Sequence, residues 1–239
     1  FDELYNALFS NAELYISVVK ALAQHHDGMT RTEISKVIGA NGGTLTRVLT
    51  NLERCDFISR SQNFGCKTKD TIYRLMDFYT LFYYKFIAQD TSGDEQWWSH
   101  NFESRLVSTW QGLTFEIVCL MHTDCIKKAL GISGMATEVS SWRKVADDKQ
   151  RGGQIDLVIK RADRIVHLCE MKFSKSEYRI TDAYEQLLRQ RMELFQSSTK
   201  TKLSLVITFV TTYGVADGLH HSIVHSEVTM SQLFIRNVT

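Results

Sequence analysis

The stretch from Gly152 to Phe173 constrains the fold most strongly, because it consists of two apolar runs on either side of a polar turn at residues 160–164. This pattern is typical of a β-hairpin. Side chains alternate between the two faces of a strand, so Glu170 and Lys172 share one face. If the two strands pair in a suitable register, Asp156 on the first strand lies beside Glu170 and Lys172 on the second. We therefore expect two carboxylates and a lysine to converge on one face of a sheet.

This combination inside apolar strands favours a site that binds a divalent cation and cleaves phosphodiesters. Mg²⁺ and Mn²⁺ take oxygen ligands, often one or two carboxylates completed by water and substrate phosphate. We expect Asp156 and Glu170 to be the metal ligands, and Glu116, which interrupts an apolar run in a preceding helix, to be a further acid. Lys172 is expected to be the catalytic lysine, which orients the metal-bound water and offsets charge on the phosphate.

The first 75 residues have the order of a winged helix-turn-helix, in which three helices precede a two-stranded hairpin. The apolar spacing predicts the helices and strands at residues 1–24, 30–38, 44–55, 57–60 and 71–75. Two segments match the capping box, in which a serine or threonine caps a helix and a glutamate three residues later bonds back to it. These segments are Ser10–Glu13 and Thr30–Glu33.

The usual docking of this module places its third helix in the major groove of DNA and its hairpin on phosphate. From Met29 to Leu75, eight basic residues stand against four acidic ones, a modest net charge of +4. We expect six side chains to face DNA: Thr44, Thr46, Arg47 and Thr50 on the third helix, and Lys67 and Lys69 on the hairpin. The alternative is a protein-interaction module, since winged helices also serve in that role.

An aromatic-rich helix at residues 78–88 and a polar loop at residues 91–95 follow, so we place the two domains at residues 1–90 and 100–239. Packing in a core explains this helix better than stacking on bases does. The second domain is predicted to have the order αβββαβ, which is a three-layer α/β fold with helices on the sheet faces. Its elements are expected at residues 101–121 (with Gly112 as a candidate break), 137–145, 154–160, 165–173, 181–195 and 202–212, then a strand near 223–224 and a short helix near 231–234.

The composition is that of an ordinary folded protein: 239 residues, of which 44% are apolar and 23% charged, with a net charge of +1. No apolar run approaches the roughly 18 residues of a membrane span, so no membrane partner is expected. The five cysteines contain no Cys-x-x-Cys pair, which favours reduced thiols in a cytoplasmic protein.

Two further patterns limit the function. Residues 39–43 are rich in glycine but lack the lysine of a phosphate-binding loop, so no ATP site is expected in this chain. His220, His221 and His225 have a spacing that a metal could use, but no acid or cysteine partner is evident nearby. We therefore expect these histidines to be solvated or hydrogen-bonded. The helical pattern that starts at Phe1 favours a piece of a longer protein.

Asp156, a spacer of thirteen residues and Glu170-Met-Lys172 resemble the signature of the PD-(D/E)xK nuclease superfamily, whose core has the same αβββαβ order. Ile155 stands where that family's name has proline, a departure common within the superfamily. A wider resemblance covers nearly the whole chain and is to the C-terminal part of prokaryotic AAA+-type ATPases that end in a nuclease-like domain of unknown function. The segments that carry it are 10–15, 73–77, 81–86, 153–157 and 169–173.

The resemblance implies a winged helix followed by a restriction-endonuclease-like domain, with an N-terminal ATPase domain of the parent chain as a partner that binds ATP. The expected function is a DNA-binding, Mg²⁺- or Mn²⁺-dependent phosphodiester hydrolase. The alternative is a catalytically inactive DNA- or protein-binding regulatory module of that ATPase. A further alternative for the hairpin itself is that Glu170 and Lys172 form only an ion pair on the protein surface. Burial of Lys172 in an ion pair would favour the alternative. The sequence leaves open DNA or RNA as the target and the oligomeric state, a homo-oligomer included.

Overall fold

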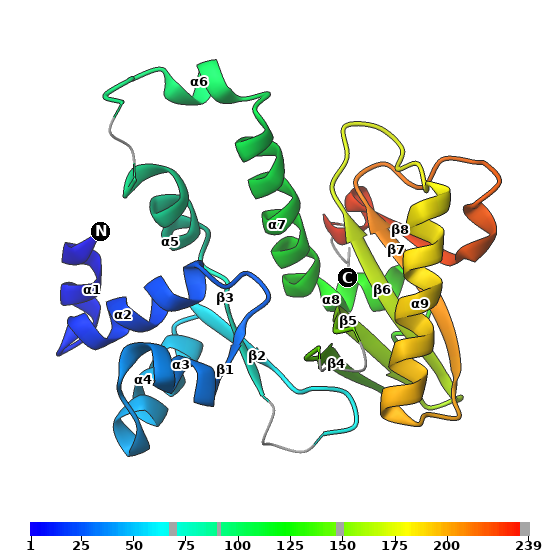
Figure 1. The fold of residues 1–239 in the computed structure, drawn as a ribbon, viewed down its shortest axis with the longest axis horizontal. Helices are drawn as coiled ribbons and strands as arrows, with labels where there is room; N and C mark the ends of the chain where they lie inside the picture. Colours follow the sequence, from blue (N-terminus) through cyan, green and yellow to red (C-terminus); the bar gives the residue numbers. More distant parts are fainter. Residues whose placement is uncertain (67–70, 90–91, 147–150, 235–239) are drawn as a thin grey trace. The chain divides into compact units, whose positions relative to one another are not determined.

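The computed structural model describes residues 1–66, 71–89, 92–146 and 151–234 (Figure 1). The chain divides into two compact units. Unit 1 consists of Phe1–Gln62 and Cys66–Phe102, and unit 2 of Asn63–Gly65 and Glu103–Thr239. The protein is of mixed α/β class, with a five-stranded mixed sheet in unit 2. Across the described ranges, no helix is both long enough and apolar enough to span a membrane.

Unit 1 begins with helices around a small antiparallel sheet. Its first elements are α1 (Asp2–Leu8), α2 (Ala12–Ala23), β1 (Met29–Thr30), α3 (Arg31–Ile38), α4 (Gly42–Arg54), β2 (Ile58–Ser61) and β3 (Ile72–Leu75). The three strands pair in the order β1-β3-β2. Helix α4 buries its apolar side chains at the spacing that the sequence predicts, namely Leu45, Val48, Leu49 and Leu52.

The predicted helix at residues 1–24 is in fact two helices, and the Ser10 capping box was wrong. The N-cap of α2 is Asn11, whose backbone has a left-handed φ of 67°, a conformation that asparagine adopts more readily than most residues. The second capping box is confirmed: Thr30 Oγ1 accepts from the Glu33 amide at 3.2 Å, and the Glu33 carboxylate accepts from the Thr30 amide at 2.7 Å.

The rest of unit 1 consists of α5 (Phe78–Phe82), a π-helical turn η2 (Tyr83–Ile87) and α6 (Trp97–Asn101). Their aromatic side chains pack on one another: the ring centroids of Phe82 and Phe86 lie 4.9 Å apart, and those of Phe86 and Trp97 lie 5.3 Å apart. Phe86 is buried. Packing inside unit 1 therefore accounts for this aromatic segment.

Unit 2 is built on the sheet of order β4-β5-β6-β7-β8, in which β4, β5 and β6 pair antiparallel and β6, β7 and β8 pair parallel. Helix α7 runs through Gly112 without a break. The elements are α7 (Arg105–Met121), α8 (Thr123–Ala129), β4 (Thr137–Lys144), β5 (Gly153–Arg161), β6 (Ile165–Lys172), α9 (Asp182–Thr199), β7 (Ser204–Thr211), η3 (His221–Ile223), β8 (Val224–Thr229) and η4 (Met230–Phe234).

Two apolar clusters hold unit 2 together, one on each face of the sheet. On one face, residues of α7 and α8 pack on Cys169 and Met171 of β6. On the other, α9 lies against the sheet (Figure 1), and its Leu188 and Phe195 are buried in the second cluster. The sheet is therefore the middle layer, and β6 is its central strand.

A short segment from the loop between β2 and β3 belongs to unit 2. The Asn63 side chain pairs with the backbone of Arg143 through two hydrogen bonds, of 3.2 and 2.9 Å. The ring of Phe64 lies 4.9 Å from that of Phe195, centroid to centroid. Two stretches of chain far apart in the sequence thus build one core.

His167 of β6 should make unit 2 sensitive to acid. It is 1% exposed, and its Nδ1 lies 2.8 Å from Thr208 Oγ1. Burial lowers its pKa to about 4; Arg161 and His225 act in the same direction, and Asp163 opposes them. An unfolded histidine has a pKa of about 6.5, so between these values the unfolded chain binds more protons than the folded one. The free energy of unfolding should therefore fall by about 3 kcal/mol as the pH drops from 6.5 to 4.

Urea denaturation at a series of pH values measures this loss. In His167→Leu the part of the slope that this side chain causes should disappear, because the substituted residue takes up no proton in either state. A slope that is the same in wild type and variant between pH 4 and 6.5 would contradict the prediction.

Candidate functional site

The carboxyl end of β6 presents two charged side chains on the face that α9 covers. Cys169 and Met171 belong to the apolar cluster on the α7 and α8 side, so the alternation of the strand turns Glu170 and Lys172 to the opposite face. Glu170 is 9% exposed, whereas the Lys172 side chain keeps 28% of its surface accessible. The structure therefore confirms the prediction that Glu170 and Lys172 lie on the same face of the strand.

Protein donors hold both oxygens of the Glu170 carboxylate. Oε1 accepts from Lys172 Nζ at 2.8 Å and from the hydroxyl of Tyr184. Oε2 accepts from Arg191 Nη1 at 2.5 Å. A buried carboxylate needs such partners, because removal from water without them is costly.

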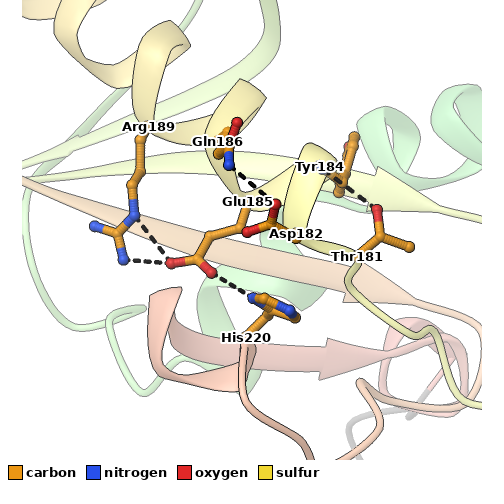
Figure 2. Close-up of polar contacts among 7 residues, drawn as sticks. All are labelled: Thr181, Asp182, Tyr184, Glu185, Gln186, Arg189 and His220. Atoms are coloured by element: carbon orange, nitrogen blue, oxygen red, sulfur yellow. Dashed lines mark hydrogen bonds and ion pairs between the residues drawn. The ribbon is translucent and has the colours of Figure 1, made fainter.

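Tyr184 and Arg191 come from α9, and the sequence analysis did not identify Arg191 as a site residue. The helix starts at its N-cap Thr181, whose hydroxyl accepts from the Tyr184 amide at 3.3 Å (Figure 2). From there Tyr184, Leu188, Arg191 and Phe195 recur at the spacing of one helix face. That spacing is the signal that could have identified Arg191 as an inward-facing cation.

The electrostatics keep Lys172 charged. Its burial favours the neutral amine, but the charge and hydrogen bond of Glu170, together with Tyr178 and Glu116, outweigh this and raise the pKa of Lys172. Burial and the neighbouring Glu170 also raise the pKa of the Tyr184 hydroxyl far above its ordinary value. Near neutral pH, Lys172 is therefore a cation and Tyr184 a hydrogen-bond donor.

Asp156 lies on β5, next to the strand that carries Glu170. The last paired residues of these two strands are Leu157 and Cys169, and Asp156 and Glu170 stand one position beyond them. Strand β5 has a β-bulge at this position. Between the pairs Ser140–Val158 and Trp142–Ile155, β5 advances by three residues and β4 by two. Such β-bulges re-aim side chains and are frequent beside active sites. The side-chain amide of Gln154 donates to Asp156 Oδ1 at 2.7 Å.

Glu116, the third predicted acid, is half-buried on α7 between the buried side chains of Phe115 and Ile117. Its charge contributes to the raised pKa of Lys172. Glu116 is thus within electrostatic reach of Lys172.

The donor chemistry of Asp156 and Glu170 fits a hard divalent cation, since both supply carboxylate oxygens and stand on adjacent strands. In the part of the chain that the structure describes, no group of three or more histidine, cysteine, aspartate or glutamate side chains could hold a metal. A cation here would need water and substrate phosphate to complete its shell, which is common for Mg²⁺.

The predicted DNA-facing residues of α4 lie on its outer side. Thr44, Thr46 and Arg47 are exposed and Thr50 is half-buried. Arg31 of α3 donates to the Gly42 carbonyl at 2.8 Å and to Thr46 Oγ1 at 3.3 Å, so it joins the start of α4 to the preceding helix. Lys67 and Lys69 lie outside the described residues.

The histidine cluster has acid partners that the sequence did not reveal. His220 Nδ1 lies 2.6 Å from Glu185 Oε2, and His221 Nε2 lies 2.7 Å from Glu227 Oε1. Figure 2 shows His220 beside Glu185, which also accepts from Arg189. The expectation that no acid stands nearby was wrong: Glu185 is distant in the sequence, and Glu227 is only six residues from His221. His220 and His221 are hydrogen-bonded, as expected.

Comparison with protein-family models, with curated proteins and with solved structures gives no match for this chain. Any functional assignment therefore depends on the residues at the end of β6 and on their geometry.

Proposed function

We propose that unit 2 is a divalent-metal-dependent nuclease of the PD-(D/E)xK type and that unit 1 is a winged helix that binds DNA. The observation that carries the proposal is the Glu170–Lys172 pair at the end of the central strand, with Asp156 on the neighbouring strand. The order of α7, β4, β5, β6, α9 and β7, with α8 added between α7 and β4 and with β6 and β7 parallel, supports it as an αβββαβ core.

In this proposal Asp156 and Glu170 hold Mg²⁺ or Mn²⁺. When bound, the cation polarises a phosphate oxygen and makes a water molecule more acidic. Lys172 acts as a fixed positive charge that stabilises the negative charge developing on phosphate, a role that its raised pKa favours over that of a base. Gln154 orients the carboxylate of Asp156 through its hydrogen bond.

For unit 1, the support is its element order. Helix α2, strand β1, helices α3 and α4, and strands β2 and β3 follow one another in the order of a winged helix, with the sheet order β1-β3-β2. The exposed side of α4 offers Thr44, Thr46 and Arg47 to a nucleic acid. The partner is DNA, and the resemblance adds an ATPase domain of a longer parent chain.

The test is cleavage of labelled single-stranded, duplex and branched DNA in Mg²⁺, Mn²⁺ or EDTA. Wild type should cut only with metal, and Asp156→Asn should lower the rate at least about 100-fold, because the site loses a charged ligand. Asp163→Asn, at the turn of the same hairpin, is the matched control and should cut like wild type. Equal cutting by wild type and Asp156→Asn would contradict the assignment.

DNA binding is measured with the same duplex by fluorescence anisotropy. Asp156→Asn should bind like wild type, whereas Arg47→Ala should bind more weakly, because it removes a cation from the exposed side of α4. Unchanged binding by Arg47→Ala would contradict the winged-helix part of the proposal.

One observation favours the alternative, a catalytically inactive DNA- or protein-binding regulator: Lys172 is in an ion pair with Glu170, whose other oxygen is held by Arg191. A wild-type protein that binds duplex DNA and cuts none of the three substrates with either metal would support this alternative.

A further inference from the structure

We propose that Arg191 competes with a divalent cation for Glu170 and so sets the metal affinity of the site, an inference that rests on the proposed nuclease function. Arg191 is here a positioning residue, since it acts through Glu170. Its role follows from how the Glu170 carboxylate is shared.

The two carboxylate oxygens have different partners. Oε1 is held by Lys172, which the same strand supplies, and by Tyr184. Oε2 is held by the guanidinium of Arg191, which comes from α9, at 2.5 Å. A cation that approaches Glu170 from the Oε2 side therefore meets a positive charge already in place.

The surroundings strengthen this competition. A small cavity at Glu170 and Arg191 has mostly apolar walls, among them Ile155, Leu188 and Ile207. Charges interact more strongly beside such walls than in water. The side chain of Arg191 is 24% accessible, against 11% for that of Glu170. Arg191 is thus the more accessible partner of a largely buried carboxylate.

Arg191 should lower the metal affinity through its positive charge rather than through its shape. Neutralising Arg191 removes the repulsion between the guanidinium and a dication while leaving both proposed ligands in place. Metal affinity should then rise. A lysine at this position keeps the positive charge and should keep the affinity low.

The test is Mn²⁺ binding to the full chain without DNA, measured by isothermal titration calorimetry. Arg191→Met and Arg191→Gln should each bind Mn²⁺ at least about tenfold more tightly than wild type, and Arg191→Lys should stay near wild type. Arg189→Met is the matched control: Arg189 lies on the same helix, 58% accessible, in an ion pair with Glu185. Its affinity should equal that of wild type.

Further variants distinguish a failure of this inference from a failure of the proposed nuclease function. Glu170→Gln or Asp156→Asn, added to Arg191→Gln, should abolish the tight binding. If both neutral Arg191 variants bind Mn²⁺ no more tightly than wild type, and Glu170→Gln still removes that binding, the competition is overturned and the nuclease site stands. If Glu170→Gln and Asp156→Asn leave Mn²⁺ binding unchanged, the cation binds elsewhere, and both the inference and the proposed function fall.

Discussion

Replacing Lys172 with methionine is expected to lower metal-dependent DNA cleavage by about 10²- to 10³-fold, the usual effect of removing one well-placed donor to a developing charge. The side chain lies 2.8 Å from Glu170, and its pKa is raised, so it is positively charged at the pH of an ordinary assay. Methionine keeps most of the side-chain length and packing but supplies no charge. Single-turnover cleavage of the best DNA substrate, at saturating Mg²⁺ or Mn²⁺, measures the effect.

Lys160→Met is the matched control, because Lys160, on the same hairpin, makes a 2.9 Å ion pair with Glu138 of β4, away from the proposed ligands. It should cut at the wild-type rate. Lys172→Arg should keep part of the activity, since the charge remains but the planar guanidinium cannot take the position of the ammonium. Retention of wild-type cleavage by Lys172→Met would remove Lys172 from the reaction.

Replacing Phe195 with alanine is expected to lower the free energy of unfolding of unit 2 by about 3–5 kcal/mol. Phe195 is 0% exposed, and its ring centroid lies 4.9 Å from that of Phe64 and 5.4 Å from that of Trp142. The truncation leaves a cavity between rigid aromatic rings that cannot collapse to fill it.

Hydrogen exchange of the β5 and β6 amides in increasing urea measures this loss for unit 2. Leu187→Ala is the control on the same helix, since Leu187 is 44% exposed, and it should cost less than about 1 kcal/mol. A similar, small loss in both variants would show that the cluster around Phe195 does not limit the stability of unit 2.

The local periodicities of the sequence predict much of this architecture. The period of two in β6 assigns Glu170 and Lys172 to one face, and the strand bears this out because Cys169 and Met171 are held by the opposite cluster. The spacing of apolar residues likewise predicts the buried face of α4. The Thr30–Glu33 capping box is a further local pattern that forms as predicted.

Features that depend on two distant segments could not be read in this way. Glu170 and Arg191 are 21 residues apart, and Glu185 and His220 are 35 apart, so only the packing of α9 on the sheet brings each pair together. Strand β1 was not predicted, because a strand of two residues is too short to show the alternation of apolar and polar side chains. The turn at Asn11 depends on one left-handed residue inside an otherwise helical pattern.

Phe64 belongs to unit 2 although it precedes Glu103 in the sequence, and this affects both the design of a unit 2 fragment and the folding of the unit during synthesis. A fragment that starts at Glu103 lacks this ring, so Phe195 keeps Trp142 but loses Phe64 as an aromatic neighbour. Asn63 and Arg143 are already 80 residues apart, and Phe195 follows later still. The earlier segment must therefore wait for α9 to be synthesised before this core closes, and contacts across such long loops are slow to form.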